Sequence, residues 1–198
     1  MIDWMTFWFW MATAHLVAVL LLIWRLDLNH QQMKRLSDHP AAAGDELPSI
    51  SIVVAARNEA RDIEAALESW FQLDYPNLEL VVVNDRSTDD TGGSLDRLAE
   101  VQSLLEVVHL EELPAGWLGK NHALQLGAKR SQGEYLLFTD ADIIIKPLVL
   151  RRAIAYMQQR KLDHLTMIPK VSMPNRLLEA FVTLFGSLFS LYFRVWKV

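Results

Sequence analysis

Cysteine is absent from this 198-residue chain, and its absence excludes several classes of function. Neither a disulfide framework, nor a cysteine-based zinc site, nor a thiol nucleophile is available. The net charge of −5 and the lack of a basic stripe give no support for nucleic acid as a partner. The sequence also lacks the glycine-rich motifs of dinucleotide-binding folds and P-loops, and the serine elbow of α/β-hydrolases. Its length fits one ordinary domain with short extensions.

A long apolar run lies near the start of the chain. From Met5 to Trp24 it is interrupted only by two threonines and one histidine. At about 1.5 Å per residue, a helix over this run is about 30 Å long, which matches the hydrocarbon core of a bilayer. We therefore predict a transmembrane anchor over residues 1–27. A cleaved signal peptide is the alternative, and it is disfavoured because the run is overlong and Asp3 makes the start acidic.

The charges around this run predict its orientation. Arg25, Lys34 and Arg35 follow it, whereas Asp3 precedes it. By the positive-inside rule, the domain after the anchor faces the cytoplasm, at the inner or plasma membrane. Residues 28–48, which end in a stretch rich in alanine, glycine and proline, are predicted to be a linker.

The other end of the chain carries an aromatic stripe at helical spacing, from Phe181 to Trp196. We predict that residues 173–198 form an amphipathic helix in the membrane interface. A second transmembrane span and a buried core helix are the alternatives. Because the sequence stops at Val198 inside this apolar pattern, we expect a C-terminally truncated piece of a longer protein.

Between these ends, residues 49–172 alternate between apolar β-branched runs and amphipathic segments. Strands are expected over Ile50–Ala55, Leu78–Val83, Glu106–Leu110, Tyr135–Thr139 and His164–Ile168. Helices are expected in a segment capped by Asn58 and over Asp90–Val101, Asn121–Ser131 and Pro147–Arg160. Such alternation predicts an α/β domain with a mainly parallel sheet flanked by helices.

Polar clusters follow three of the predicted strands, at Arg57–Glu59, Asp85–Asp90 and Asp140–Asp142. Ligands of parallel sheets bind beyond the carboxyl ends of the strands, so we expect the three clusters to form one site. Asp140 and Asp142 stand two residues apart, and on an extended segment they project to the same side. Two such carboxylates can hold one divalent cation, and oxygen ligands suit Mg²⁺ or Mn²⁺.

Together these strings resemble the family 2 glycosyltransferases of the GT-A fold. The resemblance runs from about Ser49 to Lys170 and rests on Ser51–Glu59, Val83–Thr91 and Thr139–Asp142. Gly116–Asn121 narrows it to a membrane-bound branch that includes hopanoid-associated and carotenoid-type glycosyltransferases. The fold class that the resemblance implies is a GT-A-like α/β domain with an N-terminal transmembrane helix and a C-terminal membrane-associated helix.

The resemblance also implies a nucleotide-diphosphate-sugar donor and a metal-assisted, inverting transfer. The residues that it assigns are Ala55, Arg57 and Glu59 in the nucleoside pocket, Asp85 on the base, Lys120 on the diphosphate, Asp140 on ribose or metal, and Asp142 on the metal. Because both ends of the chain are expected to hold the site at the membrane, we expect a lipid-like acceptor. No catalytic base is assigned, since nothing after Asp142 supplies the acidic acceptor-side motif of this branch.

Plainer interpretations stay open beside these roles. Asp85 and Asp89 can serve as turn or N-cap residues, and Lys120 as a solvated residue at a helix start. Arg57 and Glu59 can form a surface ion pair. At the level of function, the alternatives are a membrane-tethered nucleotide-sugar-binding or assembly subunit without transferase activity, and the donor half of a polysaccharide synthase. We expect the truncated chain to bind donor but to transfer poorly or not at all.

Overall fold

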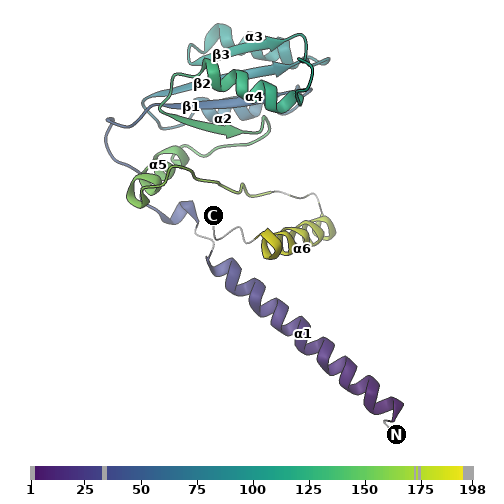
Figure 1. Cartoon of the computed structure of the whole chain (residues 1–198). Coiled ribbons are helices and arrows are strands. Elements are labelled where there is room, and N and C mark those ends of the chain that lie inside the picture. Colours follow the sequence, from purple (N-terminus) through teal and green to yellow (C-terminus); the bar gives the residue numbers. More distant parts are fainter. Residues whose placement is uncertain (1–2, 33–34, 172, 174, 194–198) are drawn as a thin grey trace. The chain divides into compact units, whose positions relative to one another are not determined.

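The computed structural model describes residues 3–32, 35–171, 173 and 175–193. The chain divides into two compact units, and each is described by itself. One unit, His39–Met167, holds the sheet and its covering helices (Figure 1). The other contains helices α1 (Trp4–Gln32) and α6 (Arg176–Phe193).

The sheet has four parallel strands in the order β3-β2-β1-β4. The strands are β1 (Ile50–Ala56), β2 (Leu78–Asp85), β3 (Leu105–Leu110) and β4 (Tyr135–Thr139). Valine and isoleucine dominate β1 and β2, which suits central strands that are buried on both faces. The predicted mainly parallel sheet is therefore confirmed. Because β2 and β4 lie on opposite sides of β1, the strand order reverses between β1 and β4, and ligands favour the carboxyl ends of strands at such a point.

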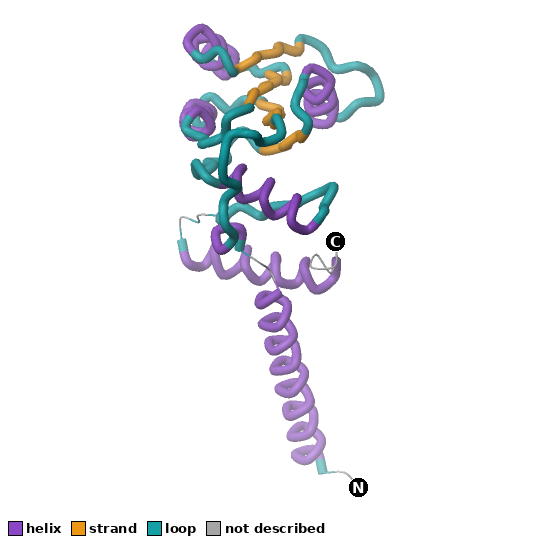
Figure 2. The backbone as a smooth tube through the Cα atoms, turned by 90° about the vertical axis from the view of Figure 1, so that its left-hand side faces the viewer, coloured by secondary structure: helices purple, strands orange, loops and turns teal. Residues whose placement is uncertain are grey.

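Helices cover both faces of this sheet, and Figure 2 shows the strands between them. The helices are α2 (Ile63–Phe71), α3 (Thr91–Val101), α4 (Gly119–Arg130) and α5 (Val149–Arg160). Helices α2, α3 and α5 share one apolar cluster with the side chains of alternate β1 residues, such as Ile52 and Val54. Helix α4 packs on the opposite face, where a Cβ on Gly127 would stand only 2.5 Å from Val53 Cγ1. The glycine therefore allows the helix to approach the sheet closely.

Helix α1 contains the stretch Trp4–Arg25, which has a mean hydropathy of 1.9. Among the described residues it is the one helix long and apolar enough to cross a membrane. The helix continues to Gln32, past the predicted end of the anchor at residue 27.

In α6, the phenylalanines of the predicted stripe from Phe181 to Phe189 are exposed, whereas Trp196 lies outside the described residues. The domain boundaries and the membrane role of α6 stay predictions.

The last part of the predicted linker 28–48 is bound to helix α5. The Arg151 guanidinium, only 11% exposed, donates to the carbonyl oxygens of Gly44 at 2.6 Å and Asp74 at 2.9 Å. It also forms an ion pair of 3.1 Å with the Asp74 carboxylate. A nearly buried guanidinium with several acceptors holds its partners firmly. The chain is therefore fixed to the α/β unit from about Ala42 onward.

Two sequence predictions about secondary structure are wrong. His164–Ile168 forms no strand, because this segment joins no ladder with the described strands, and local β-propensity supplies no hydrogen-bonding neighbour. Asn58 does not cap a helix, because α2 begins only at Ile63. Asn58 instead adopts a left-handed backbone with φ 58°, a conformation that asparagine tolerates better than most residues.

Candidate functional site

A cleft of about 420 Å³ lies at the carboxyl ends of β1, β2 and β4. Its lining consists of Ala55, Arg57, Glu59, Asp85, Lys120, Asp140, Ala141 and Asp142. Every residue to which the sequence analysis gave a site role is therefore in this lining, and Ala141 is the one addition. The cleft holds four carboxylates and two basic side chains, so its own charge favours a bound cation.

The loop after β1 contributes Arg57 and Glu59. Among the described residues, Arg57 has no hydrogen-bond or ion-pair partner, so the surface ion pair with Glu59 is not formed. Burial, followed by the negative charge of Asp142, raises the pKa of the Glu59 carboxyl above its ordinary value. This side of the cleft therefore presents an unpaired guanidinium beside a carboxyl group that holds its proton more tightly than usual.

Strand β2 ends at Asp85, which is buried at 2% exposure. Its Oδ1 accepts a hydrogen bond of 2.7 Å from Arg86 Nε, and this bond raises the pKa of the Arg86 guanidinium. Helix α4 starts at Gly119, directly beside this pair of side chains. The approach is so close that a Cβ on Gly119 would collide with Asp85 Oδ2 and with Arg86 Nη2. Gly119 therefore borders the cleft without lining it. The sequence analysis assigned it no role in the site, although it stands directly before Lys120.

Two carboxylates follow β4, in the turn that begins after Thr139. Lys120, in the first turn of α4, contacts the Asp140 carboxylate, and both side chains are more than half exposed. Asp142 is exposed and has no hydrogen bond or ion pair with any other described residue. The sequence prediction that Asp140 and Asp142 line the same site is consistent with this arrangement.

The carboxylates of Asp140 and Asp142 fit a hard divalent cation. Within residues 3–32, 35–171, 173 and 175–193, no group of three or more histidine, cysteine or acidic side chains could hold a metal ion by itself. Mg²⁺, however, is usually bound by only one or two protein carboxylates, and phosphate and water oxygens complete its shell. The two aspartates therefore suit a cation that arrives with a phosphate ligand.

Comparisons with known proteins found a matching family model and several similar proteins. The family model described as "Glycosyl transferase family 2" matches residues 51–189. An uncharacterized glycosyltransferase of Haemophilus influenzae is 30% identical over 122 residues, which cover 62% of this chain and 36% of that protein.

Two solved structures are also similar. The mannosyltransferase PcManGT from Pyrobaculum calidifontis, in complex with GDP-Man and Mn²⁺, is 33% identical with a TM-score of 0.55. That match covers 74% of this chain and 41% of the other. A fragment of TarS from S. aureus in complex with UDP is 27% identical with a TM-score of 0.51, covering 64% and 38%. The chain thus spans less than half the length of each of these proteins.

Proposed function

The chain belongs to glycosyltransferase family 2, and from this premise we propose that its cleft binds a nucleotide-diphosphate sugar whose sugar is transferred to an acceptor. The observation that carries the proposal is the convergence of polar residues from three strand ends and the start of α4 on one cleft. A Mn²⁺ complex of a similar mannosyltransferase and a UDP complex of TarS support it.

We assign the residues of the cleft by their chemistry. Ala55, Glu59 and the buried Asp85 form the nucleoside side, where Asp85 accepts a hydrogen bond from the base. The family resemblance places Arg57 in the nucleoside pocket as well, but because its guanidinium is unpaired, we propose that it binds the diphosphate together with Lys120, which pairs only with an exposed carboxylate. A guanidinium and an ammonium group both bind phosphate oxygens well.

Asp140 and Asp142 would hold Mg²⁺ or Mn²⁺. When bound, such a cation neutralises part of the negative charge on the diphosphate. Transfer breaks the bond between the anomeric carbon and a diphosphate oxygen, so negative charge grows on the leaving group. Lys120 and Arg57 stabilise that charge electrostatically.

An inverting reaction also requires a base that takes the proton of the acceptor hydroxyl, and we assign no residue to that role.

We further propose that the acceptor is lipid-like and that α1 anchors the cleft to the cytoplasmic side of the plasma or inner membrane. The apolar stretch Trp4–Arg25 and the exposed phenylalanines of α6 support a membrane location. A member of the hopanoid-associated or carotenoid-type branch would use such an acceptor.

The donor site is tested by calorimetry on the detergent-solubilised chain, with UDP-sugars and GDP-sugars, with and without Mn²⁺. Asp142→Asn removes a proposed metal ligand while keeping the size of the side chain. We expect metal-dependent binding of one nucleotide class, weakened on the order of a hundredfold or more by the substitution. Asp163→Asn is the control, because Asp163 is an exposed aspartate outside the cleft.

Binding that survives Asp142→Asn unchanged would contradict the metal assignment. A folded parent chain that binds neither nucleotide class would contradict the donor site and favour the assembly-subunit alternative.

The absence of cysteine allows a direct test of orientation. A Glu100→Cys variant carries one thiol on an exposed position of α3. In intact cells, we expect a membrane-impermeant maleimide to leave this thiol unmodified until the membrane is opened. Labelling in intact cells would contradict the cytoplasmic placement.

A further inference from the structure

The loop after β1 is held through consecutive backbone amides by residues 86–91, which are the loop after β2 and the first residue of α3 and are called the second loop below. The hydrogen bonds run from Asn58 N–H to Ser87 Oγ at 3.0 Å, from Glu59 N–H to Thr91 Oγ1 at 2.8 Å, and from Ala60 N–H to Asp89 Oδ2 at 3.2 Å. These amides belong to the segment that carries Arg57 and Glu59 into the cleft. All of the acceptors are side chains, so the sequence of the second loop determines the path of the first.

The Asn58 side chain also accepts hydrogen bonds from the second loop. Its Oδ1 accepts hydrogen bonds from the Thr88 N–H at 2.8 Å and from the Thr88 hydroxyl at 3.3 Å. The left-handed backbone of Asn58 is thus retained by contacts on both its main chain and its side chain. A left-handed non-glycine residue persists where its surroundings hold it in place, and such residues cluster at functional sites.

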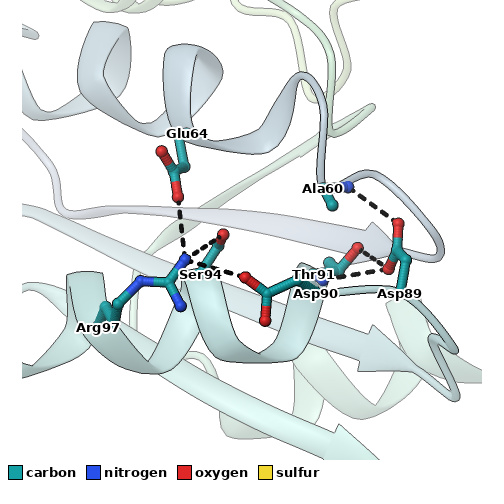
Figure 3. Close-up of polar contacts among 7 residues, drawn as sticks. All are labelled: Ala60, Glu64, Asp89, Asp90, Thr91, Ser94 and Arg97. Atoms are coloured by element: carbon teal, nitrogen blue, oxygen red, sulfur yellow. Dashed lines mark hydrogen bonds and ion pairs between the residues drawn. The ribbon is translucent and has the colours of Figure 1, made fainter.

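Asp89 joins the two loops through both carboxylate oxygens (Figure 3). Oδ2 accepts from Ala60, while Oδ1 accepts from the Thr91 N–H at 3.1 Å and from the Thr91 hydroxyl at 2.5 Å. These bonds, led by that of the Thr91 side chain, lower the pKa of the Asp89 carboxyl. The carboxylate therefore stays ionised and keeps both oxygens as acceptors.

The neighbouring Asp90 serves a different purpose. Its carboxylate pairs with Arg97 at 3.1 Å and is 70% exposed, on the side where Arg97 also reaches Glu64 of α2 (Figure 3). Within the described part of the chain, the Asp90 carboxylate forms no hydrogen bond or ion pair with residues 57–60. The two adjacent aspartates thus bind different partners, since Asp89 binds the loop after β1 and Asp90 binds Arg97 of α3.

We propose that Asn58, Asp89 and Thr91 are positioning residues that fix the loop 57–60, so that Arg57 and Glu59 are preorganised to bind the donor. None of the three lines the cleft, so each acts through the loop. This inference rests on the proposed donor site. Its physical reason is that a loop already held in its binding conformation loses less conformational freedom when the ligand binds.

Two matched pairs of variants of the full chain test the proposal. Thr91→Val keeps the shape of a fully buried side chain and removes the acceptor of the Glu59 N–H, whereas Thr91→Ser keeps the hydroxyl. Asp89→Asn replaces one acceptor oxygen with a donor, and Asp90→Asn makes the same change at the adjacent position.

Two measurements are made on each variant. Hydrogen–deuterium exchange without nucleotide reports the amides of residues 58–60, and calorimetry with Mn²⁺ reports the affinity for the nucleotide-sugar class that the parent binds. For Thr91→Val and Asp89→Asn we expect faster exchange in this loop and an affinity about tenfold lower, which corresponds to about 1.4 kcal/mol. Thr91→Ser and Asp90→Asn should stay within about twofold of the parent, less than the effect of one lost hydrogen bond.

The outcomes separate this inference from the proposed function. Unchanged loop exchange in Thr91→Val and Asp89→Asn would overturn the holding of the loop, whatever the affinity. Faster exchange with unchanged affinity would overturn the positioning role, as would an equal loss in Thr91→Ser. A parent chain that binds no nucleotide sugar would overturn the donor site and the positioning role together, while the exchange data would still show whether the side chains hold the loop.

Discussion

Polar side chains gather at both ends of the parallel sheet, and the two ends differ in how these side chains are partnered. At the amino ends, Glu79 of β2 accepts hydrogen bonds from the Ser51 hydroxyl, from Gln132 N–H at 2.5 Å and from Gly133 N–H at 3.2 Å. The Gly133 N–H also reaches Ser51 Oγ at 2.8 Å. The polar groups at this end therefore serve as hydrogen-bond partners for one another.

At the carboxyl ends, Arg57 and Asp142 reach the cleft without a partner among the described residues. A protein gains stability when polar groups are mutually satisfied, and it gains a binding site when charged groups are held in place but left open. The comparison predicts that substitutions at the amino ends change stability and leave binding intact, and that substitutions at the carboxyl ends do the reverse.

The largest effect on stability is expected from Glu79→Ala. It removes the acceptor that the Ser51 hydroxyl and the N–H groups of Gln132 and Gly133 share. Because each lost hydrogen bond contributes about 0.5–1.5 kcal/mol, we expect the free energy of unfolding to fall by about 1–3 kcal/mol. Urea unfolding measures this loss. Nucleotide affinity, measured by calorimetry, should stay unchanged because Glu79 lies at the far end of β2 from Asp85.

Glu106→Ala is the matched control on the neighbouring strand β3. Glu106 forms an exposed ion pair of 3.1 Å with Arg130, and such pairs contribute about 0–1 kcal/mol. A loss of stability in Glu106→Ala as large as in Glu79→Ala would break the comparison, as would a loss of nucleotide binding in Glu79→Ala.

The sheet and the three polar clusters at its carboxyl edge could be predicted from the sequence because both depend on local signals joined by one rule of topology, whereas the site roles of Ala55 and Lys120 were implied by the family resemblance. Runs such as Ile50–Ala55 mark strands, and parallel strands bring the residues that follow them to one edge. The predicted strand at His164–Ile168 shows the limit of this reasoning. Its local pattern resembles a strand, but pairing depends on a neighbour that the pattern does not specify.

The contacts between the two loops could not be predicted in the same way. They join Asn58 to Thr88 and Ala60 to Asp89, residues about thirty positions apart in the sequence. Asp89 and Asp90 are adjacent and of the same type, yet only Asp89 faces the first loop. Local sequence does not distinguish them, because the difference arises from the backbone path of the loop that starts with Arg86 at φ 54°.

A smaller effect, of the opposite kind, is expected from Gly119→Ala at the carboxyl end. Alanine favours a helix more than glycine does, so a change without collision would stabilise α4 by up to about 1 kcal/mol. Here the new Cβ collides with Asp85 Oδ2 and with Arg86 Nη2, so both side chains must shift, and the cost of that shift offsets the gain in helix stability. We therefore expect little change in unfolding by urea and an affinity for the nucleotide lower by about tenfold, or about 1.4 kcal/mol.

Gly186→Ala provides the control for Gly119→Ala, because a Cβ at that position of α6 meets nothing within 4 Å. It should leave nucleotide affinity unchanged. A Gly119→Ala variant that binds as tightly as the parent would show that Asp85 does not need its present position.

The smallest effect is expected from Tyr75→Phe, again at the amino ends, and this effect depends on pH only in alkali. The Tyr75 hydroxyl donates a hydrogen bond of 2.6 Å to the carbonyl of Pro48, just before β1, and burial raises its pKa to about 12. A folded-state pKa above the ordinary value of about 10 means that the folded protein keeps this proton longer than the unfolded chain. The stabilisation is therefore fully present below about pH 10 and is lost as the pH rises toward 12.

The difference in melting temperature between the parent and Tyr75→Phe should therefore be constant from pH 7 to about 9 and shrink above about pH 10. Tyr156→Phe is the control, because the Tyr156 hydroxyl forms no hydrogen bond with any other described residue. Nucleotide affinity at neutral pH should be the same in all three proteins, since the substitutions lie outside the cleft. A pH-independent difference for Tyr75→Phe would mean that the hydroxyl is not retained in its protonated form by the fold, and that the amino ends are less fully satisfied than the comparison requires.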